Sequence, residues 1–167
     1  MDILIKTRLK SFNPFQLLLA MLVMSTALMS CGSDTTGAEN ASPRITGTWK
    51  LLTATHIEKG DTVVTDYTKN ISFIKIINDT HFAFLQHDLN KGKDSSAVYV
   101  SGGGRYSLSK NLYTEHLEYC SAREWEGNDF AFNITLKGDT LIQNGIENVE
   151  AAGVNRINIE KYIRVKL

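Results

Sequence analysis

The chain has 167 residues, and its 18 basic and 18 acidic side chains give a formal net charge of zero. This balance supplies no basic surface of the kind that binds nucleic acids. The composition therefore gives no indication of a nucleic-acid partner.

The first 30 residues have the pattern of a secretory signal peptide. Lys6, Arg8 and Lys10 form a positive start, and a mostly apolar run follows at residues 15–29. This run is as long as the longest signal-peptide cores and shorter than the roughly 18 residues of a membrane-spanning helix. Residues 1–30 are therefore predicted to be a signal peptide. An uncleaved transmembrane anchor is the alternative.

The signal peptide leads into a motif around the first cysteine. Leu28-Met29-Ser30-Cys31 resembles a bacterial lipobox, in which leucine lies three positions before the cysteine and a small residue lies directly before it. The resemblance implies cleavage before Cys31 and diacylglyceryl modification of its sulfur, which anchors a protein to a lipid bilayer. Residue 32 is not the aspartate of an inner-membrane retention signal, so we expect the outer membrane of a bacterial envelope. The alternative is an ordinary secretory signal followed by a chance cysteine.

The 136 residues after Cys31 are enough for one folded domain. Loss of the leader removes three basic residues and one acidic residue, so the mature net charge is −2. Residues 31–44 comprise the lipidated cysteine and a small, polar segment without periodicity, which predicts a flexible linker. With Cys31 acylated, no intrachain disulfide can form, and Cys120 is expected to be a small, buried apolar residue.

From residue 45 onward, alternating hydrophobicity predicts β-strands. In residues 129–136 the apolar side chains recur at every second position, as in a half-buried strand. Short segments rich in Gly, Asn and Asp separate the strands, and residues 101–104 (SGGG) indicate a hairpin or bulge. The pattern predicts nine or ten strands, at residues 47–55, 63–68, 71–77, 81–87, 96–101, 104–109, 112–119, 129–136, 139–143 and 157–166.

Many short antiparallel strands favour an all-β fold. We expect a single antiparallel up-and-down β-barrel of about eight to ten strands over residues 45–167, because closure removes exposed strand edges. A two-sheet sandwich is the alternative.

Several segments resemble those of lipocalin-like bacterial lipoproteins, a mostly uncharacterised family. Gly47-Thr48-Trp49 opens the first strand, as a Gly-x-Trp motif does in lipocalins, and residues 160–166 are similar to the closing strand of that family. The phrases "GRYSLSKNLYTEHLEY" and "LKGDTLIQNG" also resemble it. In lipocalins the tryptophan packs beneath the barrel floor against an arginine of the last strand. The resemblance therefore implies that Gly47, Trp49 and Arg164 close the barrel, with a cation–π contact between Trp49 and Arg164.

Alternation alone leaves open which face of the last strand lies inside. Glu160, Tyr162 and Arg164 share one face, and the lipocalin resemblance favours that face as the interior. An interior arginine and tyrosine can hold a carboxylate, whereas an ion pair of Arg164 with Glu160 or Glu115 is the structural alternative. The candidate ligand-binding residues are Tyr106, Tyr113, Glu115, Tyr119, Tyr162 and Arg164.

No catalytic set can be assembled from the sequence. Ser107-Leu108-Ser109-Lys110 has the Ser-x-x-Lys spacing of acyl-transfer enzymes, but it falls on a strand rather than on the required helix. We therefore expect neither enzyme activity nor a cofactor or metal. Two functions fit: an anchored barrel that binds a small hydrophobic or amphipathic ligand, or a filled barrel that docks to an envelope protein.

Overall fold

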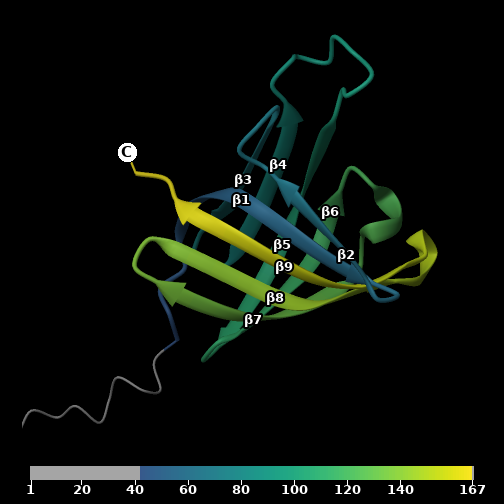
Figure 1. Ribbon diagram of the computed structural model, residues 1–167. Coiled ribbons are helices and arrows are strands. Elements are labelled where there is room, and N and C mark those ends of the chain that lie inside the picture. Colours follow the sequence, from purple (N-terminus) through teal and green to yellow (C-terminus); the bar gives the residue numbers. More distant parts are fainter. Residues whose placement is uncertain (1–41, 167) are drawn as a thin grey trace, which may run out of the picture. The chain divides into compact units, whose positions relative to one another are not determined.

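The computed structural model describes residues 42–166 (Figure 1). The predicted signal peptide, Cys31 and the linker up to residue 41 lie outside the described residues. No helix in the described part is both long and apolar enough to cross a membrane. The strands are β1 (Gly47–Glu58), β2 (Asp61–Asp66), β3 (Ile71–Ile77), β4 (His81–Asp88), β5 (Tyr99–Ser109), β6 (Leu112–Cys120), β7 (Asp129–Lys137), β8 (Thr140–Val149) and β9 (Val154–Arg164).

Eight of these strands form a closed antiparallel up-and-down barrel. The strands β3 to β9 pair in chain order, and β1 pairs with β3 on one side and with β9 on the other. Figure 1 shows β1 (blue) beside β9 (yellow), where the barrel closes. The ninth strand, β2, pairs only with the second half of β1. The predicted all-β barrel is therefore confirmed, and every element that closes it lies within residues 42–166.

Neighbouring strands separate at two places toward one end of the barrel. β1 pairs with β3 only from Gly47 to Lys50, and beyond that point it pairs with β2 instead. β7 pairs with β8 only from Phe132 onward, so its first residues contact β6 alone. Two single-turn 3-10 helices, η2 (Arg123–Trp125) and η3 (Glu150–Ala152), lie at this same end. We call it the open end; the opposite end is the closed end.

The prediction of separate strands at 96–101 and 104–109 is wrong, because β5 runs through the glycines without a break. A Cβ atom at Gly103 would lie 2.5 Å from the carbonyl oxygen of Phe82 on β4, and a Cβ at Gly104 would overlap the backbone of β6 at His116. These glycines therefore allow the neighbouring strands to approach closely, which is a common role of glycine within a strand.

A β-bulge reverses the inside–outside alternation near the end of β6. Gly103 pairs with Tyr119 and Gly104 pairs with Leu117, so Glu118 is an extra residue on β6. Leu117 is buried, whereas Tyr119 is 68% exposed. Simple alternation placed Tyr113, Glu115 and Tyr119 together inside the barrel. The bulge corrects this prediction for Tyr119, which lies on the outer surface.

The closed end is built around Trp49, which is completely buried. The guanidinium of Arg164 lies 4.0 Å from the centre of its ring, and the indole Nε1 donates a hydrogen bond of 2.8 Å to the carbonyl of Ile45. Arg164 also donates to the carbonyl of Thr46 at 2.6 Å. Its Nη1 occupies the space beside Gly47, where a Cβ would be 2.5 Å away. The structure thus places Gly47, Trp49 and Arg164 together, as the lipocalin resemblance implied.

Arg164→Ala should lower the free energy of unfolding by about 2–3 kcal/mol, because it removes a cation–π contact and hydrogen bonds from a charged donor. Arg164→Lys should recover only part of this loss, since an ammonium cannot reproduce the planar fork of a guanidinium. Urea denaturation followed by circular dichroism measures both. Unchanged stability in Arg164→Ala would show that the contact contributes nothing to closure.

Candidate functional site

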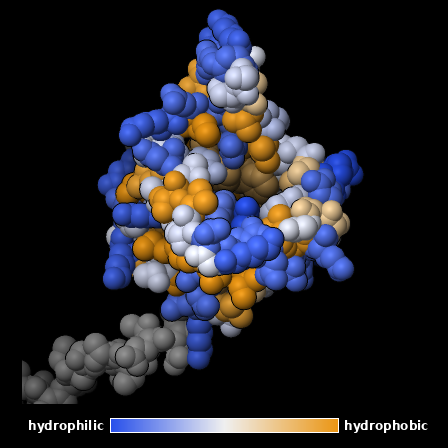
Figure 2. All heavy atoms as spheres, turned by 45° about the vertical axis from the view of Figure 1, so that its right-hand side comes forward, coloured by the Kyte–Doolittle hydropathy of each residue, from blue (hydrophilic) through white to orange (hydrophobic). Residues whose placement is uncertain are grey.

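A cavity of about 300 Å³ lies inside the barrel toward the open end. Figure 2 shows this end, where apolar residues surround a hollow and polar residues lie around it. The lining residues come from most of the strands and from the loop that contains η2. They are His56, Tyr67, Phe73, Lys75, Phe84, Gln86, Val100, Glu115, Leu117, Cys120, Ala122, Trp125, Phe130, Phe132, Gln143, Glu147, Arg156, Asn158 and Glu160.

One wall of the cavity is aromatic. Phe73 of β3 and Phe84 of β4 stack with their ring centres 5.8 Å apart, and Tyr67 meets Phe73 edge-on at the same distance. Trp125 of η2 packs against Phe130 of β7 at 5.9 Å. The strand residues point inward because alternate side chains of a strand face the same side. This wall offers an apolar surface suited to a hydrocarbon or a ring.

The other wall is polar and is formed by β8, β9 and the adjoining part of β1. Gln143 of β8 lies opposite Glu160 of β9, and Glu147 lies opposite Arg156. Asn158 lies between these two residue pairs along β9, and it is paired with His56 of β1. The cavity therefore has one apolar side and one side rich in hydrogen-bonding groups.

Lys75 lies at the inner end of the cavity and is only 2% exposed. Its Nζ is 2.6 Å from Oε1 of Glu115, 3.1 Å from Oε1 of Gln143 and 4.0 Å from Oε2 of Glu160. Burial raises the pKa of the Glu115 carboxyl, and Lys75 opposes that rise. Buried charges are tolerated when they are paired and hydrogen-bonded. Lys75 and Glu115 thus form a closed ion pair at the inner end of the cavity, and we count both residues with the polar wall.

Glu160 is held by neutral donors. Its Oε2 accepts 2.7 Å hydrogen bonds from Nε2 of Gln143 and from the hydroxyl of Tyr162. Tyr162 is completely buried, and this burial raises the pKa of its hydroxyl well above the ordinary tyrosine value. The phenol therefore remains a proton donor to Glu160.

A second ion pair lies closer to the open end. Nε of Arg156 is 2.7 Å from Oε2 of Glu147, and Nδ2 of Asn158 donates to Oε1 of the same carboxylate at 2.6 Å. Burial raises the pKa of Glu147, with Arg156 opposing that rise. Burial also lowers the pKa of His56, so that imidazole is neutral at pH 7. The guanidinium of Arg156 in turn lies 5.7 Å from the ring of Trp125.

The predicted ligand-binding residues are distributed over three regions. Glu115 lines the cavity, and Tyr113 and Tyr162 are buried in the barrel interior. All three lie on strand faces that were expected to be interior. Tyr106 also points inward but contacts the closed end, where its hydroxyl donates to the carbonyl of Asn78 at 2.8 Å. Tyr119 lies outside the barrel, as described above.

Arg164 corrects a further prediction. It pairs with neither Glu160 nor Glu115, because both of its terminal nitrogens donate to backbone carbonyls, those of Thr46 and Arg44. The cation that pairs with Glu115 is Lys75 instead.

Sequence reasoning missed most of the polar wall. Lys75 lies within the apolar run ISFIKII and shares the parity of Phe73 and Ile77, so strict alternation would have placed it inside. Gln143 and Glu147 have the parity of buried Leu141 in the same way. Polar side chains at apolar positions are the signal that identifies such a site.

The chain was compared with known proteins. No family model matches it, and a search of curated proteins finds no match. Within residues 42–166, no group of three or more His, Cys, Asp or Glu side chains is arranged to hold a metal ion.

Lys75→Met should destabilise the fold by about 3–5 kcal/mol at pH 7, because it leaves the Glu115 charge buried without a partner. Burial already raises the pKa of Glu115, and removal of Lys75 should raise it further. The folded variant then binds a proton more tightly than the unfolded chain, so its stability falls as pH rises above the ordinary glutamate value of 4.5. Urea denaturation at pH 5 and pH 7 should show the smaller deficit at pH 5.

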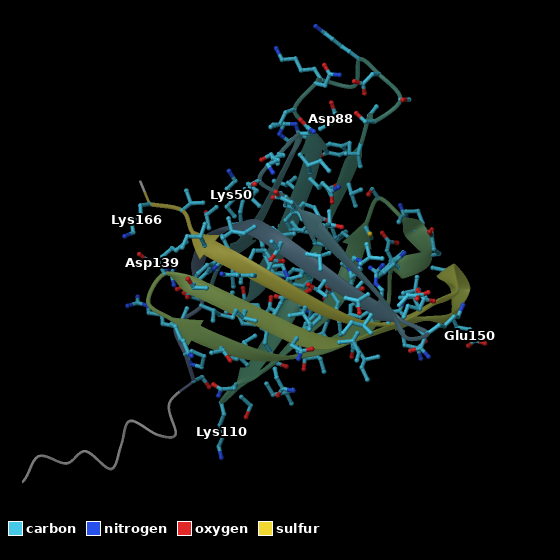
Figure 3. The ribbon with its side chains drawn as sticks, in the orientation of Figure 1. Lys50, Asp88, Lys110, Asp139, Glu150 and Lys166 are labelled. Atoms are coloured by element: carbon cyan, nitrogen blue, oxygen red, sulfur yellow. The ribbon has the colours of Figure 1, made fainter. Side chains whose placement is uncertain are left out.

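Two variants control this experiment. The double variant Lys75→Met with Glu115→Gln should recover much of the stability and lose the pH dependence. Lys166→Met removes an exposed lysine that lies 2.6 Å from Asp139 (Figure 3), and it should leave stability unchanged because exposed ion pairs contribute little. Equal effects of Lys75→Met and Lys166→Met would contradict the buried-pair interpretation.

Proposed function

We propose that this protein binds a small amphipathic molecule inside its barrel while acylated Cys31 anchors it to the outer membrane. The observation that carries the proposal is the internal cavity with one aromatic wall and one polar wall. Its volume of about 300 Å³ lies at the lower end of the range for small-molecule sites.

The polar wall favours ligand recognition over a purely structural core. Buried ion pairs rarely increase stability compared with well-packed apolar side chains of similar volume. Here Glu115, Glu147, Arg156 and Lys75 all line the same cavity. An arrangement that is costly for folding is expected where polar groups must meet a bound molecule.

The anchor supports the same function. A bilayer supplies amphipathic molecules, and a flexible linker of the predicted length would hold the barrel at a root-mean-square distance of roughly 20 Å from the surface. The lipocalin resemblance also favours this function, since its barrels enclose single small ligands.

Native mass spectrometry of the chain from residue 32 onward, expressed without the acyl group and purified without detergent, tests the proposal. We expect an extra mass that is lost on denaturation. Val100→Trp should abolish it, because Val100 lines the cavity and an indole at this position fills the space.

Tyr99→Trp is the matched control. Tyr99 precedes Val100 on β5 but is 67% exposed, so tryptophan there should leave the extra mass in place. Circular dichroism shows whether both variants remain folded. A clean apo mass, repeated after incubation with envelope lipid extract, would contradict ligand binding and favour docking to an envelope protein.

Cys31→Ser should release the full chain from the membrane fraction and abolish incorporation of an alkyne-labelled palmitate, since the Cys31 sulfur is the attachment point of the diacylglyceryl group. Cys120→Ser should change neither readout, because Cys120 is buried in the barrel. Retention of Cys31→Ser in membranes would instead indicate an uncleaved transmembrane anchor.

A further inference from the structure

The polar wall contains more acidic groups than basic ones. Lys75 pairs with Glu115 at 2.6 Å, and Arg156 pairs with Glu147 at 2.7 Å. Glu160 is the third carboxylate of the cavity lining, and its closest cation, Lys75, is 4.0 Å away and already bound to Glu115. His56, which also lines the cavity, is neutral. Glu160 is therefore the carboxylate whose charge the wall does not balance.

Beside Glu160 lies an acceptor without a donor. Asn158 is two residues before Glu160 on β9, lines the cavity and is only 2% exposed. Its Nδ2 donates to Glu147, which leaves the carbonyl oxygen Oδ1 as an acceptor. Oδ1 has no hydrogen-bond partner among the described residues. A buried polar atom left without a partner is destabilising, so this atom points to a missing donor.

We propose that Glu160 and Oδ1 of Asn158 together form a subsite for the protonated amine of an amphipathic ligand. An ammonium group supplies several N–H donors and one positive charge. Donors satisfy Oδ1 of Asn158 and the Oε1 atom of Glu160, to which no residue in 42–166 donates. The positive charge of the ammonium group, added to those of Lys75 and Arg156, balances the three carboxylates that line the cavity. This subsite rests on the proposed function, because it assigns a chemical class to the ligand.

The rest of the wall disfavours an anionic ligand. Lys75 donates to Glu115 and Gln143, and Arg156 binds Glu147. A carboxylate entering this space would face Glu160 with no unpaired cation beside it, and like charges in a water-poor site repel strongly. The aromatic wall accepts the apolar part of the ligand, and aromatic faces also attract alkylammonium groups.

Three probes of equal chain length test the subsite: octylamine, octanoate and octan-1-ol. They differ only in the head group, which at pH 7 is cationic, anionic or neutral. Each is titrated, below micelle-forming concentrations, into the chain from residue 32 onward, which contains every strand of the closed barrel. Binding is followed by the fluorescence of Trp125 in the cavity wall. We expect octylamine to bind about tenfold or more tightly than either other probe.

Glu160→Gln should weaken octylamine binding by about tenfold and leave octan-1-ol affinity unchanged, because it removes the unbalanced charge but keeps both ion pairs. Unchanged octan-1-ol affinity also shows that the cavity is intact. Glu150→Gln is the matched control: Glu150 is exposed on η3 near the open end (Figure 3), carries the same charge, and does not line the cavity.

The outcomes separate the two proposals. If octan-1-ol binds but octylamine binds no better, or if Glu160→Gln leaves octylamine affinity unchanged, the amine subsite is wrong and the binding function stands. If none of the three probes binds and native mass spectrometry shows an apo protein, both proposals fail. Octylamine binding that Glu150→Gln weakens as much as Glu160→Gln would reflect net charge and would also overturn the subsite.

Discussion

The pairing of β1 with β9 is the constraint on which the rest of the structure depends. It joins the two ends of the sheet, so that every interior side chain must face the same enclosed space. Trp49 and Arg164 lie opposite each other in this pairing, and their contact covers the floor. Trp49 and Arg164 close one end, and the cavity lies toward the other end, where β1 no longer pairs with β3 and the first residues of β7 do not pair with β8.

The two ends of the interior differ in how they are filled. Toward the closed end, Ile45, Trp49, Leu51 and Leu141 are almost completely buried and belong to the hydrophobic core. Toward the open end, strand separation leaves a space that side chains do not fill. Charged residues inside a closed apolar core would be costly, and they lie instead where the cavity begins. The position of the polar wall thus follows from the geometry of the strands.

The charged side chains of the cavity form two closed ion pairs, and two buried polar atoms of the described residues, Oδ1 of Asn158 and the Tyr113 hydroxyl, have no hydrogen-bond partner. Lys75 pairs with Glu115, and Arg156 pairs with Glu147. This pairing offsets part of the free-energy cost of burying their charges. Glu160 and Asn158 keep acceptor capacity that no described side chain uses. This unused acceptor capacity is the observation on which the proposed amine subsite rests.

Much of the fold could be predicted from the sequence because its determinants are local. The period-two pattern predicted most strands, including β7, whereas only the lipocalin resemblance favoured the inner face of β9, and the Gly-x-Trp motif indicated the floor. The signal peptide and the acylation of Cys31 remain predictions from short motifs, because they lie outside the described residues. What only the tertiary structure decided involves contacts between distant strands. The bulge at Glu118 depends on the close approach of β5 and turns Tyr119 outward, and the choice of Lys75 over Arg164 as the partner of Glu115 depends on which strands face each other across the barrel. Local alternation carries no information about either, because it defines the face of a strand but not what lies opposite that face.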